Sequence, residues 1–264
     1  MNTQFMKVLA INSLPANGNA GMKMVMHVLG TRVIPVPSLL LTGIGSLSGF
    51  EKFPIPFKQM LSGTLALAKR REEALIVYIG YLGNADQISI INESLQQYKD
   101  IVKYIIVDPV CGDHGKAYVP REIIANWGTL IESADLCLPN VTEAALLSGY
   151  TENYQKKHAE NYLKAFRKRF PNTALLATSI EQESYLINRL YKDNTIVETK
   201  HKKQAKNYGG SGDAFASYLI NAHFYKTLPL EKAIYTAGEA VRKAISYSFE
   251  NGQKDLMLSF TTDL

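Results

Sequence analysis

The fold is decided by the segment Ala74–Asp113, ALIVYIGYLGNADQISIINESLQQYKDIVKYIIVDPVCGD. It begins with Ala74–Ile79, an apolar run with the pattern of a parallel strand buried on both faces. Ala85–Tyr98 then places apolar residues at helical spacing, and Tyr104–Val107 is a second apolar run. The order strand, helix, strand predicts a βαβ unit.

The same alternation extends along the chain on both sides of this unit. Further strands are expected at Lys7–Asn12, Thr31–Pro35, Leu136–Leu138 and Ala174–Thr178. Further helices are expected at Met22–Leu29, Phe57–Arg70, Pro120–Ile131, Val141–Leu147, Tyr154–Phe170, Gly212–Tyr225 and Leu230–Phe249. Tyr185–Ile187 and Thr195–Glu198 flank a turn and predict an antiparallel edge hairpin. We therefore expect an α/β fold, a three-layer α/β/α sandwich around a mostly parallel central sheet, with no separate lid domain.

Composition places the chain among ordinary globular proteins. Its 264 residues are 46% hydrophobic and 20% charged, and we expect one domain spanning residues 1–264. The net charge of +5 is a weak bias toward anions, so no nucleic-acid partner is expected. Cys111 and Cys137 cannot form a disulfide framework, and no run approaches the roughly 18 apolar residues of a membrane span. We expect a cytoplasmic protein that does not bind membranes.

Polar residues follow each apolar strand of the predicted sheet. They are Ser13, the stretch Gly80–Gly83, Asp108, Asp113, Asn140, Glu143, Thr178 and Ser179. In open α/β sheets, ligands bind beyond the carboxyl ends of the strands. The sequence therefore predicts one shared site at that edge.

The most informative segment is Tyr208–Ser217, YGGSGDAFAS. Glycines at the start of a helix leave N–H groups free to hold an anion, and the helix dipole adds partial positive charge there. Asp213 is the first carboxylate of this helix, and beside an anion pocket it could accept a proton from an attacking hydroxyl. The alternative is that Asp213 only stabilises the first turn of the helix.

Several other motifs are missing from the sequence. It contains no GxxxxGK[ST] phosphate loop, no HExxH, no EF-hand loop and no zinc-ligand spacing. Gly43–Gly49 lacks the GxGxxG spacing and is better interpreted as an active-site flap.

The chain resembles the ribokinase superfamily, and within it the pyridoxal kinases. The matching segments are Ala10–Ser13, Gly18–Gly21, Val36–Thr42, Gly80–Gly83 with Ala85–Gln87, Val107–Asp113, Tyr118–Pro120, Pro139–Glu143, Thr178–Ser179 and Gly210–Asp213. They occur in the family's order and span nearly the whole chain. GYLG together with DPVxGD is more specific than the other motifs.

The resemblance implies a role for each matching residue. Asp213 is the general base for the 5′-hydroxymethyl group of pyridoxal, pyridoxine or pyridoxamine, and the amides of Gly210, Ser211 and Gly212 form the anion hole. Asn140 and Glu143 hold Mg-ATP, Asp113 orders Mg²⁺ through water, and Asp108, Thr178 and Ser179 line the nucleotide phosphates. Ser13, Ser38 and Tyr81 contact the B6 vitamer. A homodimer is also implied.

The residues themselves leave alternatives open. Asn140 and Glu143 could form a helix capping box, Tyr81 could be a core aromatic, and Asp108 could simply end a strand. The basic residues between Lys156 and Arg169 are expected on a solvated helix face. One of Lys200, Lys202, Lys203 and Lys206 could instead reach the ATP phosphates.

The chain departs from the family pattern at Asn17 and Thr42–Gly49, both near the expected substrate. These departures bear on which vitamer is preferred. Asp213 separates the chain from hydroxymethylpyrimidine (phosphate) kinases, which commonly have Cys at that position. Three alternatives remain: such a thiamine-pathway kinase, a sugar kinase of the superfamily, and a non-catalytic B6-binding protein.

Overall fold

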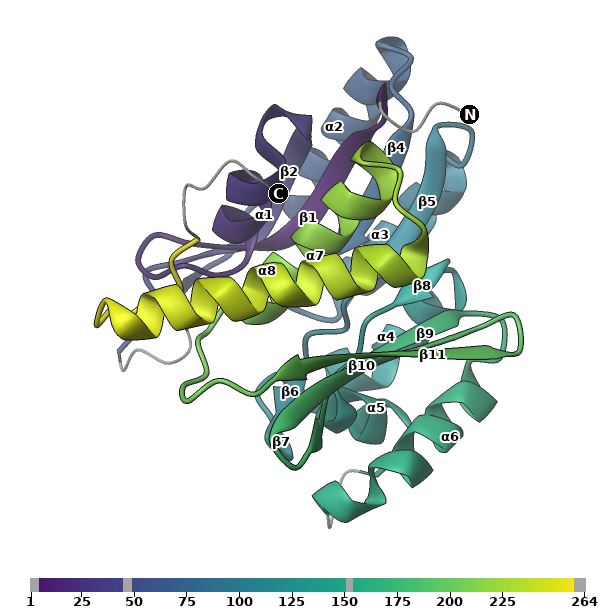
Figure 1. Ribbon diagram of the computed structural model, residues 1–264. Coiled ribbons are helices and arrows are strands. Elements are labelled where there is room, and N and C mark those ends of the chain that lie inside the picture. The colour runs from purple at the N-terminus through teal and green to yellow at the C-terminus, as the bar shows by residue number, and fades with distance from the viewer. Residues whose placement is uncertain (1–4, 45–48, 151–153, 259–264) are drawn as a thin grey trace.

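The structure is a computed structural model that describes residues 5–44, 49–150 and 154–258. A nine-stranded sheet, in the order β11-β10-β9-β8-β5-β4-β1-β2-β3, runs through the molecule (Figure 1). Its strands are β1 (Lys7–Pro15), β2 (Val33–Leu41), β3 (Lys52–Phe53), β4 (Leu75–Ile79), β5 (Val102–Val107), β8 (Leu136–Cys137), β9 (Ala174–Gln182), β10 (Tyr185–Lys192) and β11 (Thr195–Lys202). The short β6 (Gly112–Asp113) and β7 (Lys116–Ala117) form a separate antiparallel pair.

The six central strands, from β9 to β2, are parallel to one another. The antiparallel pairs lie at the two ends of the sheet, where β10 joins β9 and β11, and β3 joins β2. The predicted edge hairpin is therefore confirmed, and both of its strands are longer than expected.

Helices cover both faces of the sheet. One face carries α2 (Phe57–Arg70), α3 (Asp86–Gln97), α4 (Arg121–Glu132), α5 (Val141–Leu147) and α6 (Ala159–Arg169). The other face carries α1 (Met22–Leu29), α7 (Ser211–Ile220) and α8 (Leu230–Glu250). Figure 1 shows α8 crossing this second face beside α7. The predicted three-layer α/β/α sandwich is confirmed.

The alternation of side chains along β4 explains why this strand is apolar throughout. Leu75, Val77 and Ile79 pack in the core on the α2–α6 side of the sheet. Ile76 and Tyr78 pack in the core on the opposite side. Every position is buried because both faces of a central parallel strand are covered by helices.

Several element boundaries differ from the sequence prediction. The strand expected at Thr31–Pro35 runs instead over Val33–Leu41, and Gly30–Arg32 forms a 3₁₀ turn that ends α1. The described part of β3 pairs with β2 at Leu40 and Leu41, beyond both prolines of β2. Prolines are tolerated in strands with an open edge, so they do not end β2.

The helix expected at Tyr154–Phe170 is shorter in the structure, where α6 starts at Ala159. The Tyr154 ring stacks on that of Tyr162, with centroids 5.6 Å apart, and the Gln155 N–H donates to the Tyr162 hydroxyl. The segment before α6 is therefore folded back onto the helix. The predicted helix Gly212–Tyr225 is also divided, because α7 ends at Ile220 and a π turn, Asn221–Tyr225, follows it.

Two further predictions concern the flap and the membrane. Most of the predicted flap Gly43–Gly49 lies outside the described residues, since residues 45–48 are not among them. Among the residues that are described, no helix combines the length and apolar character needed to cross a bilayer.

Candidate active site

The first part of the site is the N-terminus of α7. Gly210 precedes the helix with φ +83°, and a Cβ there would lie 2.2 Å from the carbonyl oxygen of Asn19. The first helical hydrogen bond is donated by Ala214 N to Gly210 O, so the amides of Ser211 and Gly212 come before the helical ladder. No side chain caps this end. The turn therefore offers free N–H groups to an anion.

The Asp213 carboxylate stands in the first turn of the same helix. Asn12 Nδ2 donates to its Oδ1 and the Gly21 N–H donates to its Oδ2, both at 2.8 Å. Burial raises the pKa of Asp213 above its ordinary value, while these two hydrogen bonds oppose the rise because they stabilise the charged form. The side chain is held in one orientation, with a raised pKa suited to a general base.

Asn12 is a site residue that sequence reasoning missed. Its side chain is buried, and its Oδ1 accepts hydrogen bonds from Ser13 N at 2.8 Å and Tyr81 N at 3.2 Å. A Cβ at Gly80 would lie 2.5 Å from Asn12 Nδ2, so the glycine leaves room for the amide. The sequence signal was its position: Asn12 is a polar residue at the end of the predicted apolar strand Lys7–Asn12.

The three residues predicted to contact the vitamer lie around Asn12. Ser13 is buried beside Gly21, where a Cβ would lie 3.0 Å from Ser13 Oγ. Ser38 is also buried, and its hydroxyl donates to the Tyr81 carbonyl at 2.6 Å. The structure thus brings Ser13 and Tyr81 to Asn12 and joins Ser38 to Tyr81.

A groove of about 400 Å³ opens next to Ser38. Its wall includes Lys52, Phe57, Gly83 and Gln87, whereas Asp213 is not among its lining residues. The groove therefore borders Ser38 but not Asp213.

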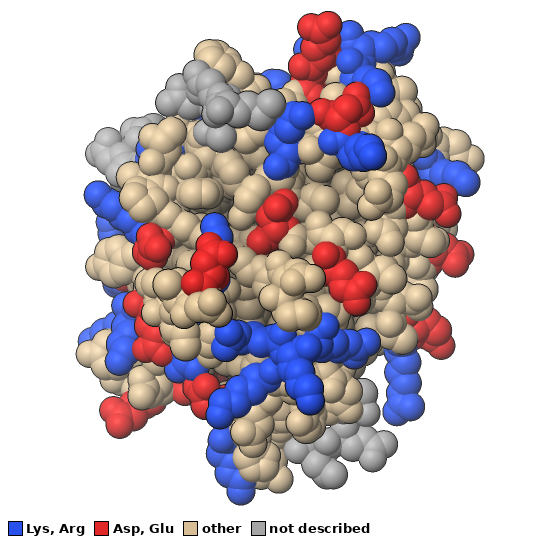
Figure 2. Space-filling view, turned by 90° about the vertical axis from the view of Figure 1, so that its right-hand side faces the viewer, with Lys and Arg blue, Asp and Glu red and all other residues tan. Residues whose placement is uncertain are grey.

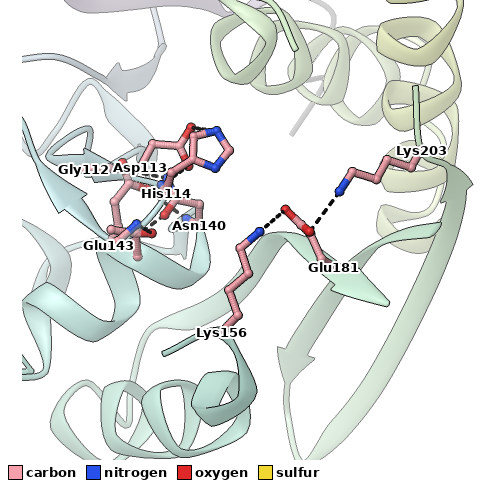
Figure 3. A network of polar contacts seen from close by, with 10 residues as sticks. Gly112, Asp113, His114, Asn140, Glu143, Lys156, Glu181 and Lys203 are labelled. Atoms are coloured by element: carbon pink, nitrogen blue, oxygen red, sulfur yellow. Dashed lines mark hydrogen bonds and ion pairs between the residues drawn. The ribbon is translucent and has the colours of Figure 1, made fainter. Parts of the chain in front are cut away.

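The second part of the site is the N-terminus of α5, drawn in Figure 3. Asn140 Oδ1 accepts from Glu143 N at 2.9 Å, and Glu143 Oε2 accepts from Asn140 N at 2.8 Å, which is a complete capping box. Glu143 Oε1 also accepts from Cys111 N, and Asn140 Nδ2 donates to Gly112 O. The capping-box alternative is therefore present in the fold.

Asp108 lies between the two parts of the site. Its Oδ2 accepts a hydrogen bond from the buried Tyr78 hydroxyl at 3.1 Å. Burial raises the pKa of Asp108, and the nearby charge of Asp213 raises it further. Burial likewise raises the pKa of Glu143 well above its usual range, with the charge of Asp108 as the next cause. Asp108 is therefore close enough to Asp213 and to Glu143 for their charges to interact.

Thr178 and Ser179 lie next to Asn140. Thr178 forms a parallel bridge with Asn140, and its N–H donates to Pro139 O at 3.0 Å. Ser179 is exposed with φ +56°, a conformation that non-glycine residues rarely adopt, and its N–H donates to Asn188 Oδ1. The structure therefore brings the middle of β9, at Thr178, to the residue that precedes α5.

The residues present fit a magnesium ion whose ligands are mostly waters and phosphate oxygens rather than protein side chains. Asp113 is exposed, and its Oδ1 accepts from His114 N at 2.8 Å. Within the described ranges, no group of three or more His, Cys, Asp or Glu side chains could hold a metal. Mg²⁺ commonly binds through one or two carboxylates together with waters and phosphate oxygens, so Asp113 and Glu143 are suitable donors.

The basic residues fall into separate groups. Lys156 and Lys203 both pair with Glu181, whereas Lys206 Nζ donates to Gln253 O at 3.4 Å.

The basic residues of α6 are exposed, and Figure 2 shows a group of Lys and Arg side chains across the lower half of the molecule, where α6 lies.

The fold and the site together define the class of protein. A mostly parallel sheet between two helical layers, with a glycine-rich helix start at its carboxyl edge, is a ribokinase-like α/β kinase fold. A family model described as phosphomethylpyrimidine kinase matches residues 58–259, so the chain belongs to this family. It is a kinase of the pyridoxal and phosphomethylpyrimidine kinase family, and the predicted resemblance is confirmed.

Two relatives represent the two activities. The chain is 28% identical over 239 residues to BUD17 of Saccharomyces cerevisiae, described as a putative pyridoxal kinase, covering 82% of this chain and 74% of that protein. It is 27% identical over 218 residues to the hydroxymethylpyrimidine/phosphomethylpyrimidine kinase of Aquifex aeolicus, covering 80% and 82%.

Solved structures share the fold. The pyridoxal kinase of Lactobacillus plantarum superposes with a TM-score of 0.81 at 22% identity, covering 95% of this chain and 91% of that one. The pyridoxal kinase of Leishmania donovani, in complex with ADP and pyridoxamine, gives a TM-score of 0.77 at 20% identity, covering 96% and 90%.

Proposed function

We propose that this kinase transfers the γ-phosphoryl group of ATP to the 5′-hydroxymethyl group of pyridoxal, pyridoxine or pyridoxamine. The observation that carries the proposal is the Asp213 carboxylate, fixed by Asn12 and Gly21 beside the uncapped N-terminus of α7. A base and a set of anion-binding amides at one turn are the two elements that phosphoryl transfer to an alcohol requires.

In this mechanism Asp213 accepts the proton of the substrate hydroxyl as the hydroxyl oxygen attacks the γ-phosphorus. The bond between the γ-phosphorus and the bridging oxygen breaks, and ADP leaves. The Gly210, Ser211 and Gly212 amides stabilise the negative charge that develops on the transferred group. Ser13, Ser38 and Tyr81 orient the pyridine ring at the ends of β1, β2 and β4. The hydrogen bonds from Asn12 and Gly21 keep the Asp213 carboxylate turned toward the hydroxyl.

We assign the nucleotide to the neighbouring strands. Asp108, Asn140, Thr178 and Ser179 would line its phosphates, and Asp113 and Glu143 would hold Mg²⁺, which when bound neutralises phosphate charge. The ADP complex of the Leishmania donovani kinase, which shares this fold, supports ATP as the co-substrate.

Phosphorylation of hydroxymethylpyrimidine or its phosphate is the second candidate function. The Aquifex aeolicus relative and the matching family both favour it. Asp213 favours the vitamin B6 reaction, because thiamine-pathway kinases of this kind commonly have Cys at that position.

The deciding experiment is an ATP-dependent phosphorylation assay with pyridoxal, pyridoxine, pyridoxamine, hydroxymethylpyrimidine and its phosphate. Products are identified by mass spectrometry, and kcat/KM is measured for each substrate. We expect the highest kcat/KM with a B6 vitamer. A higher value with the pyrimidine would support the second candidate, and vitamer binding without ATP consumption would indicate a non-catalytic binding protein.

We also propose that residues 1–264 act as one domain, that the protein is a homodimer, and that it works in the cytoplasm. Sedimentation at micromolar concentration would test the dimer. A monomer that retains full turnover would contradict it.

A further inference from the structure

Glu181 bridges two lysines from different parts of the chain. Lys156 Nζ lies 2.9 Å from its Oε1, and Lys203 Nζ lies 2.9 Å from its Oε2. These two hydrogen bonds are the chief cause of the lowered pKa of Glu181. One carboxylate paired with two ammonium groups leaves a surplus positive charge at this point.

The bridge lies at the edge of the sheet that carries the site. Glu181 is on β9, two residues after Ser179, and both side chains are exposed while Ile180 between them is buried. Lys203 directly follows β11, whose carboxyl end is at the same edge because β10 is antiparallel to both neighbours. Figure 3 shows the Lys156–Glu181–Lys203 group in the same view as Asp113 and as Asn140 and Glu143 at the start of α5.

We propose that Lys156 and Lys203 form a binding subsite for the polyphosphate chain of the nucleotide, and that Glu181 occupies this subsite until the nucleotide displaces it. The inference deepens the proposed function and rests on it. A carboxylate is the side chain whose charge and oxygen geometry come nearest to those of a phosphate, so Glu181 acts as an internal competitor for the two lysines.

The physical reason for displacement is the difference in charge. A nucleoside triphosphate carries several negative charges, whereas Glu181 carries one, so the two lysines gain more from the ligand. All three side chains are between 33% and 59% exposed, and ion pairs this exposed contribute little to stability. The bridge can therefore open at little cost to the fold.

The test measures binding of a non-hydrolysable ATP analogue with Mg²⁺ by calorimetry. Glu181→Gln removes the competitor, so we expect a dissociation constant about threefold lower than that of the wild type. Lys156→Met and Lys203→Met each remove a charge-assisted contact, so we expect dissociation constants about tenfold higher. Lys157→Met is the matched control, because Lys157 is exposed next to Lys156, and it should bind as the wild type does.

The direction in which Glu181→Gln changes the dissociation constant of the ATP analogue decides between a competing and a bracing role of Glu181. If Glu181 only braces the two segments, its replacement will weaken binding, and that result would overturn the proposal. Unchanged affinity in both lysine variants would also overturn it. Adenosine, which has no phosphates, should bind all four variants equally.

Failure of the proposed function can be told apart from failure of the subsite. If the protein binds vitamers without kinase activity, the wild type would not bind the nucleotide analogue and the variants would have no affinity to compare. If it phosphorylates the pyrimidine instead, it would still bind the analogue, and the same comparison of variants would apply. Circular dichroism of each variant shows that the fold is retained.

Discussion

The N-termini of α5 and α7 lie at the same edge of the sheet, but only the N-terminus of α5 is capped by side chains. At α5 the Asn140 and Glu143 side chains form a complete capping box. At α7 the preceding residue is Gly210, and no side chain caps the helix. A helix that satisfies its first amides internally is stabilised, whereas one that leaves them free can bind an anion.

The carboxylates in the first turns of these two helices also differ. The oxygens of Glu143 accept backbone N–H groups from Asn140 and Cys111, and its side chain is almost completely buried. Asp213 is only partly buried and is held from β1 and the β1–α1 loop, 192 to 201 residues away in sequence. The Glu143 carboxylate is thus fixed within the fold, whereas the Asp213 carboxylate remains partly exposed beside an uncapped helix start.

The largest effect is expected at Asp213. Asp213→Asn removes the base, so turnover should fall by about 10²–10⁴-fold while the fold is retained. Steady-state kinetics with the best substrate measures the loss. Glu231→Gln, in the exposed first turn of α8, is the matched control and should retain turnover. A near-normal rate in Asp213→Asn would show that α7 has no catalytic base.

Gly210→Ala tests the open turn itself. A Cβ at this left-handed position would collide with Asn19 O, so the free energy of unfolding should fall by about 1–3 kcal/mol. Chemical denaturation measures this change. In Gly212→Ala the Cβ meets nothing within 4 Å, so the stability should remain close to that of the wild type. Equal losses in the two variants would mean that the close contact with Asn19 is unimportant.

Asn12→Ala tests how Asp213 is held. The Asn12 N–H stabilises the charged carboxylate, so its removal should raise the pKa of Asp213 further. A general base works when deprotonated, so the acidic limb of the kcat/KM profile should move to higher pH, and turnover should fall about tenfold. Asn126→Ala, at an exposed residue that bonds within α4, serves as control. An unmoved limb would contradict the role of Asn12.

The smallest effect is expected at Glu143. If Glu143 helps to hold Mg-ATP beyond its capping role, Glu143→Gln should raise the Mg²⁺ concentration for half-maximal rate about fivefold, equivalent to about 1 kcal/mol. Glu132→Gln, exposed in the last turn of α4, should leave the titration unchanged. An unchanged titration in Glu143→Gln itself would limit this residue to the capping box.

Local patterns predicted most of the fold. The helices α1, α2 and α5 have the predicted bounds, because apolar spacing within each segment is enough to define them. The course of β2 past Pro35 and Pro37 depends on which neighbours pair with its outer edge, which is a tertiary property. The late start of α6, at Ala159 rather than Tyr154, likewise depends on the stacking of Tyr154 on Tyr162.

The site was predictable where a motif is continuous in sequence. The glycine turn before Asp213 and the spacing of Asn140 and Glu143 are both visible in the chain, and their roles toward ligands stay predictions. Asn12 could not be assigned from sequence, because its importance arises only when Gly80 and Asp213 meet it in space. The pairing of Lys156 with Lys203 through Glu181 joins three separate segments and was hidden for the same reason.

The distance in sequence between Asp213 and its partners has a consequence for biosynthesis. Asn12 and Gly21 are made early, and the carboxylate that they hold follows 201 and 192 residues later. A ribosome-bound chain that stops before α7 therefore carries the first half of this arrangement without its acid. Catalytic competence would arise in one late step, when α7 docks beside α1 and β1, and truncated products would be inert however well their sheet has formed.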